Sequence, residues 1–192
     1  MKKLSEKDMQ NVSEVEFFVS GYTMQRIMII GYPGGGKTTL AIQVGKILSI
    51  PVYHCDRIKQ VENFEWKPMD EIHALINEVI SKDKWILEGY STTEMMPVCI
   101  ERADTLIFVD FNRFLCMWRV TKRSIKHHGK CRPDVGDGCK DGFPPFFLYW
   151  VIWTFPKKYR KRFLDWISTN EKRVFHFKKR KELKRFIENL RN

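Results

Sequence analysis

Residues 26–39 read Arg-Ile-Met-Ile-Ile-Gly-Tyr-Pro-Gly-Gly-Gly-Lys-Thr-Thr, and this stretch decides the fold. The apolar run at 27–30 predicts a buried parallel strand, which leads directly into the spacing G-x-x-x-x-G-K-T from Gly31 to Thr38. Glycines at 34–36 let successive backbone N–H groups approach phosphate oxygens, because no Cβ stands in the way. The pattern therefore predicts a P-loop, the phosphate-binding turn between a strand and a helix.

The residues of this turn are expected to bind Mg-ATP. Lys37 is expected to reach the β- and γ-phosphates, and the Thr38 hydroxyl is expected to be a ligand of Mg²⁺. The helix that begins at Lys37 directs its positive N-terminus at the same anion. The predicted nucleotide-binding residues of the turn are Gly31, Gly34, Gly35, Gly36, Lys37, Thr38 and Thr39.

The composition favours one α/β domain with a basic C-terminal half. The chain has 192 residues, of which 43% are hydrophobic and 30% charged, as is usual for a globular protein. Residues 1–112 contain 12 Lys or Arg and 16 Asp or Glu, whereas residues 113–192 contain 22 and 7. The basic half either faces an anionic partner or forms a solvated surface.

The location and assembly of the protein are only loosely constrained by the sequence. Five cysteines without disulfide spacing, and an N-terminus unlike a signal peptide, predict a cytoplasmic protein. The aromatic run at 143–155 is too short to span a bilayer. The protein is expected to be a monomer or a dimer.

Strands alternate with helices along the chain, which predicts a parallel sheet. Besides the P-loop strand and helix, the pattern predicts strands at 51–56, 85–89, 105–110 and 174–177, and helices at about 70–81, 93–102, 112–128 and 179–190. Residues 143–162 are predicted to pack on the sheet as a helical pair. Residues 1–23 are expected to be a partly disordered extension, which leaves residues 24–192 as the domain. Residues 129–142 contain four glycines and predict a flexible flap.

Three predicted strands end in a carboxylate, at Asp56, Glu88 and Asp110. Ligands of a parallel sheet bind at the carboxyl ends of its strands, so these acids are expected on the P-loop edge. Glu88 and Asp110 are the candidates for serving Mg²⁺ together with Thr38. Asp56 is the candidate for orienting or deprotonating an acceptor hydroxyl, although a helix-capping role remains open for it.

The predicted helix at 112–128 has two different faces. Phe114, Trp118 and Ile125 share one face and are expected to dock the helix on the sheet. Arg119 and Arg123, one turn apart, lie away from that face and are expected to point over the P-loop edge toward the flap.

Four segments together resemble a known family. They read R-I-M-I-I-G-x-x-G-x-G-K-T, P-V-Y-H-C-D, E-R-A-D-T-L-I-F-V-D-F-N-R-F-L-C-M-W-R-V-x-K-R and, in the flap, R-P-D-x-x-x-G-C. Over about residues 24–190 the chain resembles the bacterial DNA topology modulation proteins, which are small P-loop proteins similar to adenylate kinase. The resemblance implies a three-layer, nucleoside-kinase-like α/β fold with a five-stranded parallel sheet in the order 2-3-1-4-5, and a flap that acts as a lid.

The resemblance also implies roles for individual residues. Arg119 and Arg123, with Arg132 in the flap, would meet the triphosphate, and Glu88 would hold Mg²⁺-bound water. Thr92 stands where adenylate kinases carry the arginine that grips the acceptor phosphate, so the resemblance does not extend to a nucleoside monophosphate as acceptor.

Two classes of function fit these patterns. The leading hypothesis is a Mg-ATP-dependent phosphotransferase with an unidentified small-molecule or nucleotide acceptor, because such enzymes work by positioning and charge stabilisation. Its predicted catalytic residues are Lys37, Arg119, Arg123 and Asp56. The alternative is a nucleotide-gated nucleic-acid-binding protein that affects DNA topology, in which aromatic residues of the basic half would stack on bases: Trp150, Trp153 and Tyr159.

A metal site in the flap is a third alternative. Its ligands would be His127, His128, Cys131 and Cys139. Their spacing lacks the paired C-x₂-C units of a structural zinc site.

Overall fold

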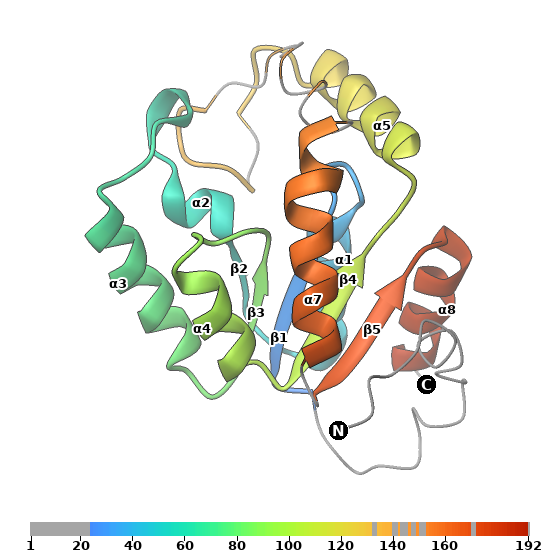
Figure 1. Cartoon of the computed structure of the whole chain (residues 1–192). Coiled ribbons are helices and arrows are strands. Elements are labelled where there is room, and N and C mark those ends of the chain that lie inside the picture. Colours follow the sequence, from blue (N-terminus) through green and yellow to red (C-terminus); the bar gives the residue numbers. More distant parts are fainter. Residues whose placement is uncertain are drawn as a thin grey trace.

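A computed structural model describes residues 24–131, 134–139, 142, 146, 149, 153–169 and 172–191. The predicted extension at 1–23 and the predicted nucleotide ligand Arg132 lie outside these residues. In the described part of the chain, a central sheet lies between helices (Figure 1).

The sheet has five parallel strands in the order β2-β3-β1-β4-β5, which confirms the predicted topology. The strands are β1 (Arg26–Gly31), β2 (Val52–His54), β3 (Trp85–Glu88), β4 (Thr105–Val109) and β5 (Arg173–Phe177). The apolar run at 27–30 is buried because β1 lies in the middle of the sheet and is covered on both faces.

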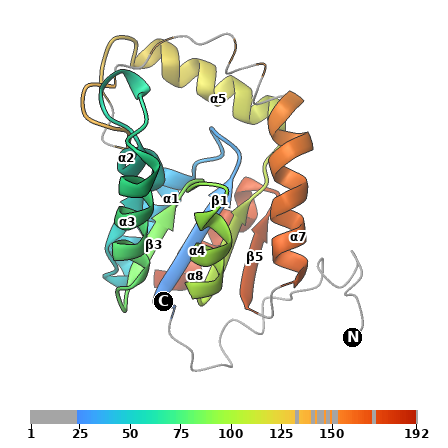
Figure 2. The same cartoon turned by 60° about the vertical axis from the view of Figure 1, so that its left-hand side comes forward.

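Helices cover both faces of the sheet (Figures 1 and 2). One face is covered by α1 (Lys37–Leu48) and α8 (Arg180–Arg191), which contact each other. The other face is covered by α3 (Met69–Ile80), α4 (Met95–Arg102) and α7 (Lys161–Thr169). On this face the ring of Phe163 packs edge-on against Phe108 of β4, with 5.6 Å between the centroids. These two layers and the sheet form the predicted three-layer α/β fold.

Further helices surround the carboxyl edge of the sheet. They are α2 (Cys55–Lys59), the 3-10 helix η2 (Glu62–Phe64), α5 (Arg113–Lys126) and the π-helix η4 (Pro156–Arg160), which continues into α7. The second strand ends earlier than predicted, so Asp56 lies in the first turn of α2. At the start of α5, the side chain of Asn112 accepts a hydrogen bond of 2.9 Å from the backbone N–H of Phe114.

The prediction that the apolar face of α5 docks on the sheet is wrong. Phe114, Trp118 and Ile125 are 54%, 56% and 68% exposed. The sheet has its faces covered by other helices, and α5 instead crosses above its carboxyl edge (Figure 2). Its buried side chains are the small residues Cys116, Val120 and Ser124.

The close contact of α5 is with the P-loop. A Cβ added to Gly34 would lie 2.4 Å from the carbonyl oxygen of Cys116 and 2.8 Å from Val120 Cγ2. Such an approach is possible only where one partner lacks a side chain. Gly34 thus lets the helix rest directly on the turn.

The described flap residues 134–139 lie against the segment that follows α2. The thiol of Cys139 donates to the carbonyl of Val61 at 2.9 Å and accepts from the N–H of Phe64 at 3.2 Å. A Cβ on Gly136 would lie 2.4 Å from the carbonyl oxygen of Gln60. The flap therefore reaches across the carboxyl edge of the sheet.

The buried thiol of Cys139 thus has backbone partners and does not face the histidines of the proposed zinc site. Among the residues that the structure describes, no group of three or more His, Cys, Asp or Glu side chains is placed to hold a metal ion alone. None of the described helices combines the length and the apolar character that crossing a membrane requires.

Candidate active site

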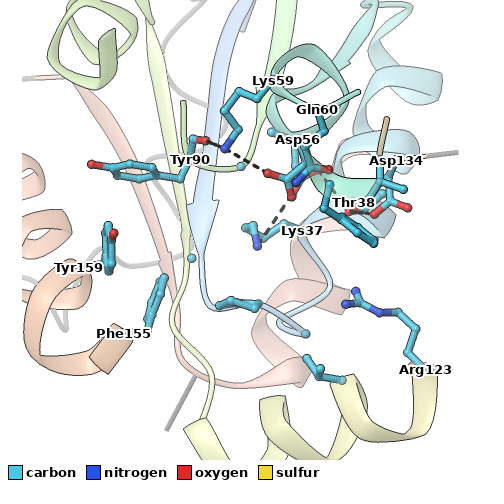
Figure 3. Close-up of a pocket in the computed structure, with 18 of the residues that line it drawn as sticks. Lys37, Thr38, Asp56, Lys59, Gln60, Tyr90, Arg123, Asp134, Phe155 and Tyr159 are labelled. Atoms are coloured by element: carbon cyan, nitrogen blue, oxygen red, sulfur yellow. Dashed lines mark hydrogen bonds and ion pairs between the residues drawn. The ribbon is translucent and has the colours of Figure 1, made fainter. Parts of the chain in front are cut away.

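A cavity of about 1170 Å³ opens between the carboxyl edge of the sheet and α5 (Figure 3). Its walls come from the P-loop, α2 and the segment after it, the end of β3, α5, flap residues 134–135, and the region from Phe155 to Phe163. Ligand sites of this size hold a drug-sized molecule with room to spare. The cavity is therefore larger than one drug-sized ligand requires.

The P-loop forms the floor of this cavity. Gly34 and Gly36 have φ angles of +76° and +93°, which residues with a Cβ rarely adopt. Gly35 does not line the cavity; its N–H donates to the carbonyl of Tyr32 at 3.0 Å and closes the turn. The predicted residues that do line it are Gly31, Gly34, Gly36, Lys37, Thr38 and Thr39.

Lys37 and Glu88 form the charged centre of the floor. The ammonium of Lys37 donates to the carbonyl of Tyr32 at 3.1 Å and lies 3.8 Å from Glu88 Oε1. The Glu88 carboxylate, 7% exposed, also accepts from the Thr38 hydroxyl at 3.2 Å and lies 3.0 Å from His54 Nδ1. His54 was missed in the sequence, although it pairs with Glu88 in the register of β2 and β3.

The oxygen atoms around Thr38 fit Mg²⁺. Besides Glu88, the carboxylate of Asp134 in the flap lies 3.5 Å from the Thr38 hydroxyl. Mg²⁺ in phosphotransfer sites is held by one or two carboxylates together with waters and substrate phosphates. One hydroxyl and two carboxylates match that requirement, and Asp134 could have been predicted from the R-P-D motif of the flap.

Asp110 does not join this group. Arg160 donates to both of its carboxylate oxygens at 2.9 Å, and His176 Nε2 lies 2.9 Å from Oδ2. Burial alone would raise the pKa of Asp110, but these hydrogen bonds outweigh it and hold the pKa below its ordinary value. The acid lines a separate crevice of about 300 Å³ and ties β4 to β5 and η4.

Arg119 and Arg123 reach the cavity from α5, which forms its roof. In Figure 3 the guanidinium of Arg123 points from this helix toward the P-loop. The Arg119 guanidinium lies 5.6 Å from the centroid of the Phe111 ring, so one aromatic face positions it. Both side chains thus lie on the cavity side of a helix whose apolar face is exposed.

Asp56 lines the part of the cavity that lies away from Arg119 and Arg123. Beside it is a buried lysine, Lys59, which was not among the predicted site residues. Lys59 is 4% exposed; its ammonium lies 3.1 Å from Asp56 Oδ1 and donates to the carbonyl of Tyr90 at 2.6 Å. It also lies 5.0 Å from the centroid of the Trp66 ring. The i,i+3 spacing of Asp56 and Lys59 on α2 could have predicted this ion pair from the sequence.

The sheet order, the P-loop and the position of α5 across the carboxyl edge of the sheet are those of the P-loop kinase fold. One solved structure with this fold is shikimate kinase from Acinetobacter baumannii in complex with shikimate, with a TM-score of 0.58, 10% identity and coverage of 88% of this chain and 91% of that one. Another is shikimate kinase from Bacteroides thetaiotaomicron, with a TM-score of 0.53, 18% identity and coverage of 88% and 97%. A putative kinase from Chloroflexus aurantiacus matches with a TM-score of 0.50, 14% identity and coverage of 88% and 98%.

The sequence comparisons identify no relative. No protein-family model and no curated protein matches this chain. The resemblance to the DNA topology modulation proteins is therefore not confirmed, and the structural likeness, at these low identities, is one of fold.

Proposed function

We propose that this protein is a phosphotransferase that moves the γ-phosphoryl group of Mg-ATP to a hydroxyl group of a small-molecule or nucleotide acceptor. The observation that supports it best is one cavity with Lys37, Thr38 and Glu88 on its floor and Arg119 and Arg123 in its roof. Phosphoryl transfer depends on positioning and charge stabilisation around the transferred group. These residues provide positive charge from both sides of that position.

The residues on the floor and in the roof have different tasks in this proposal. Lys37 and the N–H groups at the start of α1 bind the β- and γ-phosphates. Thr38, Glu88 and Asp134 would hold Mg²⁺, which would neutralise charge on the phosphate oxygens when bound. Arg119 and Arg123 bind the transferred group through guanidinium N–H donors, which match phosphate oxygens in pairs.

Asp56 serves the acceptor in this proposal. The ion pair with Lys59 orients its carboxylate, while the Asp56 side chain remains 54% exposed. The acceptor oxygen forms a bond to the γ-phosphorus as the bond to the bridging oxygen breaks and ADP leaves. The hydroxyl proton passes to Asp56 and then to solvent.

The first prediction tests the nucleotide site. Lys37→Ala should weaken binding of a non-hydrolysable ATP analogue, measured by calorimetry with Mg²⁺, by about tenfold or more, and it should abolish phosphoryl transfer from γ-labelled ATP. Its melting temperature without ligand should stay close to wild type, since the ammonium serves the ligand and not the core. Lys46→Ala, an exposed lysine at the other end of α1, is the matched control. Wild-type affinity in Lys37→Ala would show that the P-loop assignment is wrong.

A further inference from the structure

The acceptor side of the cavity is the part that lies away from the roof arginines. Its walls include α2, the segment from Gln60 to Trp66, the turn after β3, and the aromatic residues from Phe155 to Phe163. Figure 3 shows Tyr90, Phe155 and Tyr159 on one side of Lys37, and Asp134 and Arg123 on the other. A second substrate placed beside Lys37 therefore meets a different set of groups from those that face the nucleotide.

Positive charge is scarce on the acceptor side. Among the described residues that line the cavity, the Lys and Arg side chains apart from Lys59 belong to the P-loop or to α5: Lys37, Arg119 and Arg123. The ammonium of Lys59 already has Asp56 and the Tyr90 carbonyl as partners. Arg162 lies behind this wall, where it donates to the Tyr90 hydroxyl at 3.4 Å.

Thr92 lines the wall of the acceptor side, and its side chain has a structural task. It is 2% exposed, its hydroxyl accepts from the N–H of Met95 at 3.1 Å, and it lies 3.1 Å from His73 Nε2. Next to it, Glu94 adds a carboxylate to the wall. Among the described residues that line this side, Lys59 is the cation and is already paired, so an anionic acceptor would be desolvated beside acids, which is unfavourable.

Aromatic rings line this side from two directions. Phe64 and Trp66 line the cavity and are 39% and 53% exposed, so part of each ring is open to a ligand, while the Lys59 ammonium lies 5.0 Å from the centroid of the Trp66 ring. On the other wall the rings of Tyr90 and Tyr159 meet edge-on at 5.1 Å, and Phe155 stacks on Tyr159 at 5.5 Å. Aromatic side chains arranged in this way bind flat rings by stacking or edge contacts.

We infer that the acceptor is an uncharged alcohol that carries a planar ring, such as a nucleoside, and not a phosphorylated or carboxylated molecule. The ring lies among the aromatic side chains, and its hydroxyl group points at Asp56 and Lys37. This inference rests on the phosphotransferase function proposed above, and it specifies the substrate class of the same site.

The test is calorimetry on the full-length protein with Mg²⁺ and a saturating non-hydrolysable ATP analogue. The neutral probes are the four ribonucleosides, thymidine and pyridoxine. The anionic probes are the matching 5′-monophosphates and shikimate. At least one neutral probe should bind tenfold or more tightly than its phosphorylated form.

Variants then locate the ring. Trp66→Ala should weaken binding of that neutral probe about tenfold and leave the affinity for the ATP analogue unchanged. Trp118→Ala, a tryptophan of similar exposure on the outer face of α5, should bind both ligands as wild type does. Melting temperatures of all three proteins check that they are folded.

Two results would overturn the inference: none of the neutral probes binds, or an anionic probe binds as tightly as its neutral counterpart. If the ATP analogue still binds in either case, the proposed phosphotransferase function survives and only the acceptor class is wrong. If the analogue itself does not bind, both proposals fail.

Discussion

Glu88 shows how contacts between single residues organise the floor of the cavity. Its buried carboxylate is held by Thr38 and His54, and it keeps the Lys37 ammonium within 3.8 Å. The lysine is further anchored by the Tyr32 carbonyl. A nucleotide phosphate therefore meets a cation that is already in place, which reduces the entropy lost on binding.

The second prediction concerns the arginines of the roof. Arg119→Lys and Arg123→Lys should each lower the rate of phosphoryl transfer by about tenfold or more, because an ammonium is a point charge and cannot bind phosphate oxygens in pairs. ATP at a hundredfold excess over its Kd should stabilise the wild type by about 2.7 kcal/mol, and both variants should keep most of that shift. A loss in rate without an equal loss in affinity is expected for contacts made in the transition state.

Arg113→Lys is the matched control for the roof. Arg113 lies on the same helix, but its guanidinium contacts the rings of Phe114 and Trp153 and does not line the large cavity. This variant should transfer phosphate at the wild-type rate. If both roof variants do so as well, Arg119 and Arg123 are surface charges and the mechanism proposed for them is wrong.

The residues of the site differ in how well the sequence could predict them. The P-loop glycines, Lys37 and Thr38 follow from a local spacing, because one turn and one helix terminus determine their environment. Partners from distant parts of the chain could not be assigned in this way. The sequence placed Asp110 beside the phosphate edge but could not show that Arg160 and His176, 50 and 66 residues away, already bind its carboxylate.

At the scale of elements, periodicity predicted the existence of α5 but not the face that it buries. The apolar face of Phe114, Trp118 and Ile125 is the stronger pattern in the sequence, yet the buried stripe is Cys116, Val120 and Ser124. The reason is the partner: α5 packs on the backbone of the P-loop at Gly34, where only small side chains fit.

The third prediction tests this orientation of α5. Val120→Ala should lower the free energy of unfolding by about 2 kcal/mol, because Val120 is 1% exposed and its loss leaves a cavity beside Gly34. Trp118→Ala should change it by less than about 0.5 kcal/mol, as is usual for an exposed side chain. Urea unfolding at neutral pH measures the free energy of unfolding of both variants. If Trp118→Ala is the more destabilising of the two, the larger side chain is buried in solution and the observed orientation is not the stable one.

At the scale of the whole molecule, Asp110 joins three elements that are distant in sequence. It follows β4, and its carboxylate binds Arg160 of η4 and His176 of β5. Its side chain is 4% exposed, so removing its charge leaves its cationic partner beside a neutral group in a partly buried position.

The fourth prediction is that Asp110→Asn lowers the free energy of unfolding at pH 7 by about 2 to 4 kcal/mol, as for other broken buried ion pairs. The folded pKa of Asp110 lies below its unfolded value of about 4, so its contribution is complete above that pH and is lost as the pH falls through the folded pKa. The difference between wild type and variant, measured by urea unfolding from pH 7 to pH 3, should therefore shrink toward low pH. Asp137→Asn, with its side chain 95% exposed, should match wild type throughout. A difference that stays constant down to pH 3 would contradict this role of the carboxylate.

The fifth prediction concerns the net charge of +11, which combines +15 from residues 113–192 with −4 from residues 1–112. If the basic residues served nucleic acid, duplex affinity would fall with salt at a log–log slope of about −0.9 for each phosphate contacted. In the structure, Arg119 and Arg123 of this half line the cavity and Arg160 binds Asp110, whereas Lys157 and Lys158 are exposed. We therefore expect a Kd for duplex DNA no tighter than about 10⁻⁶ M at physiological salt, which is the range of non-specific binding.

Fluorescence anisotropy with a labelled duplex, from about 50 to 200 mM salt, measures this affinity and its slope. The variant Lys157→Glu with Lys158→Glu reverses two exposed charges of η4 that do not line the large cavity. Phosphoryl transfer should be unchanged in it, because positive charge at the site comes from Lys37 and the roof arginines. Submicromolar binding by the wild type with a steep slope that this variant reduces would instead make nucleic acid a physiological ligand. The basic half would then have to be assigned to that ligand and not to the roof and flap of a phosphotransferase.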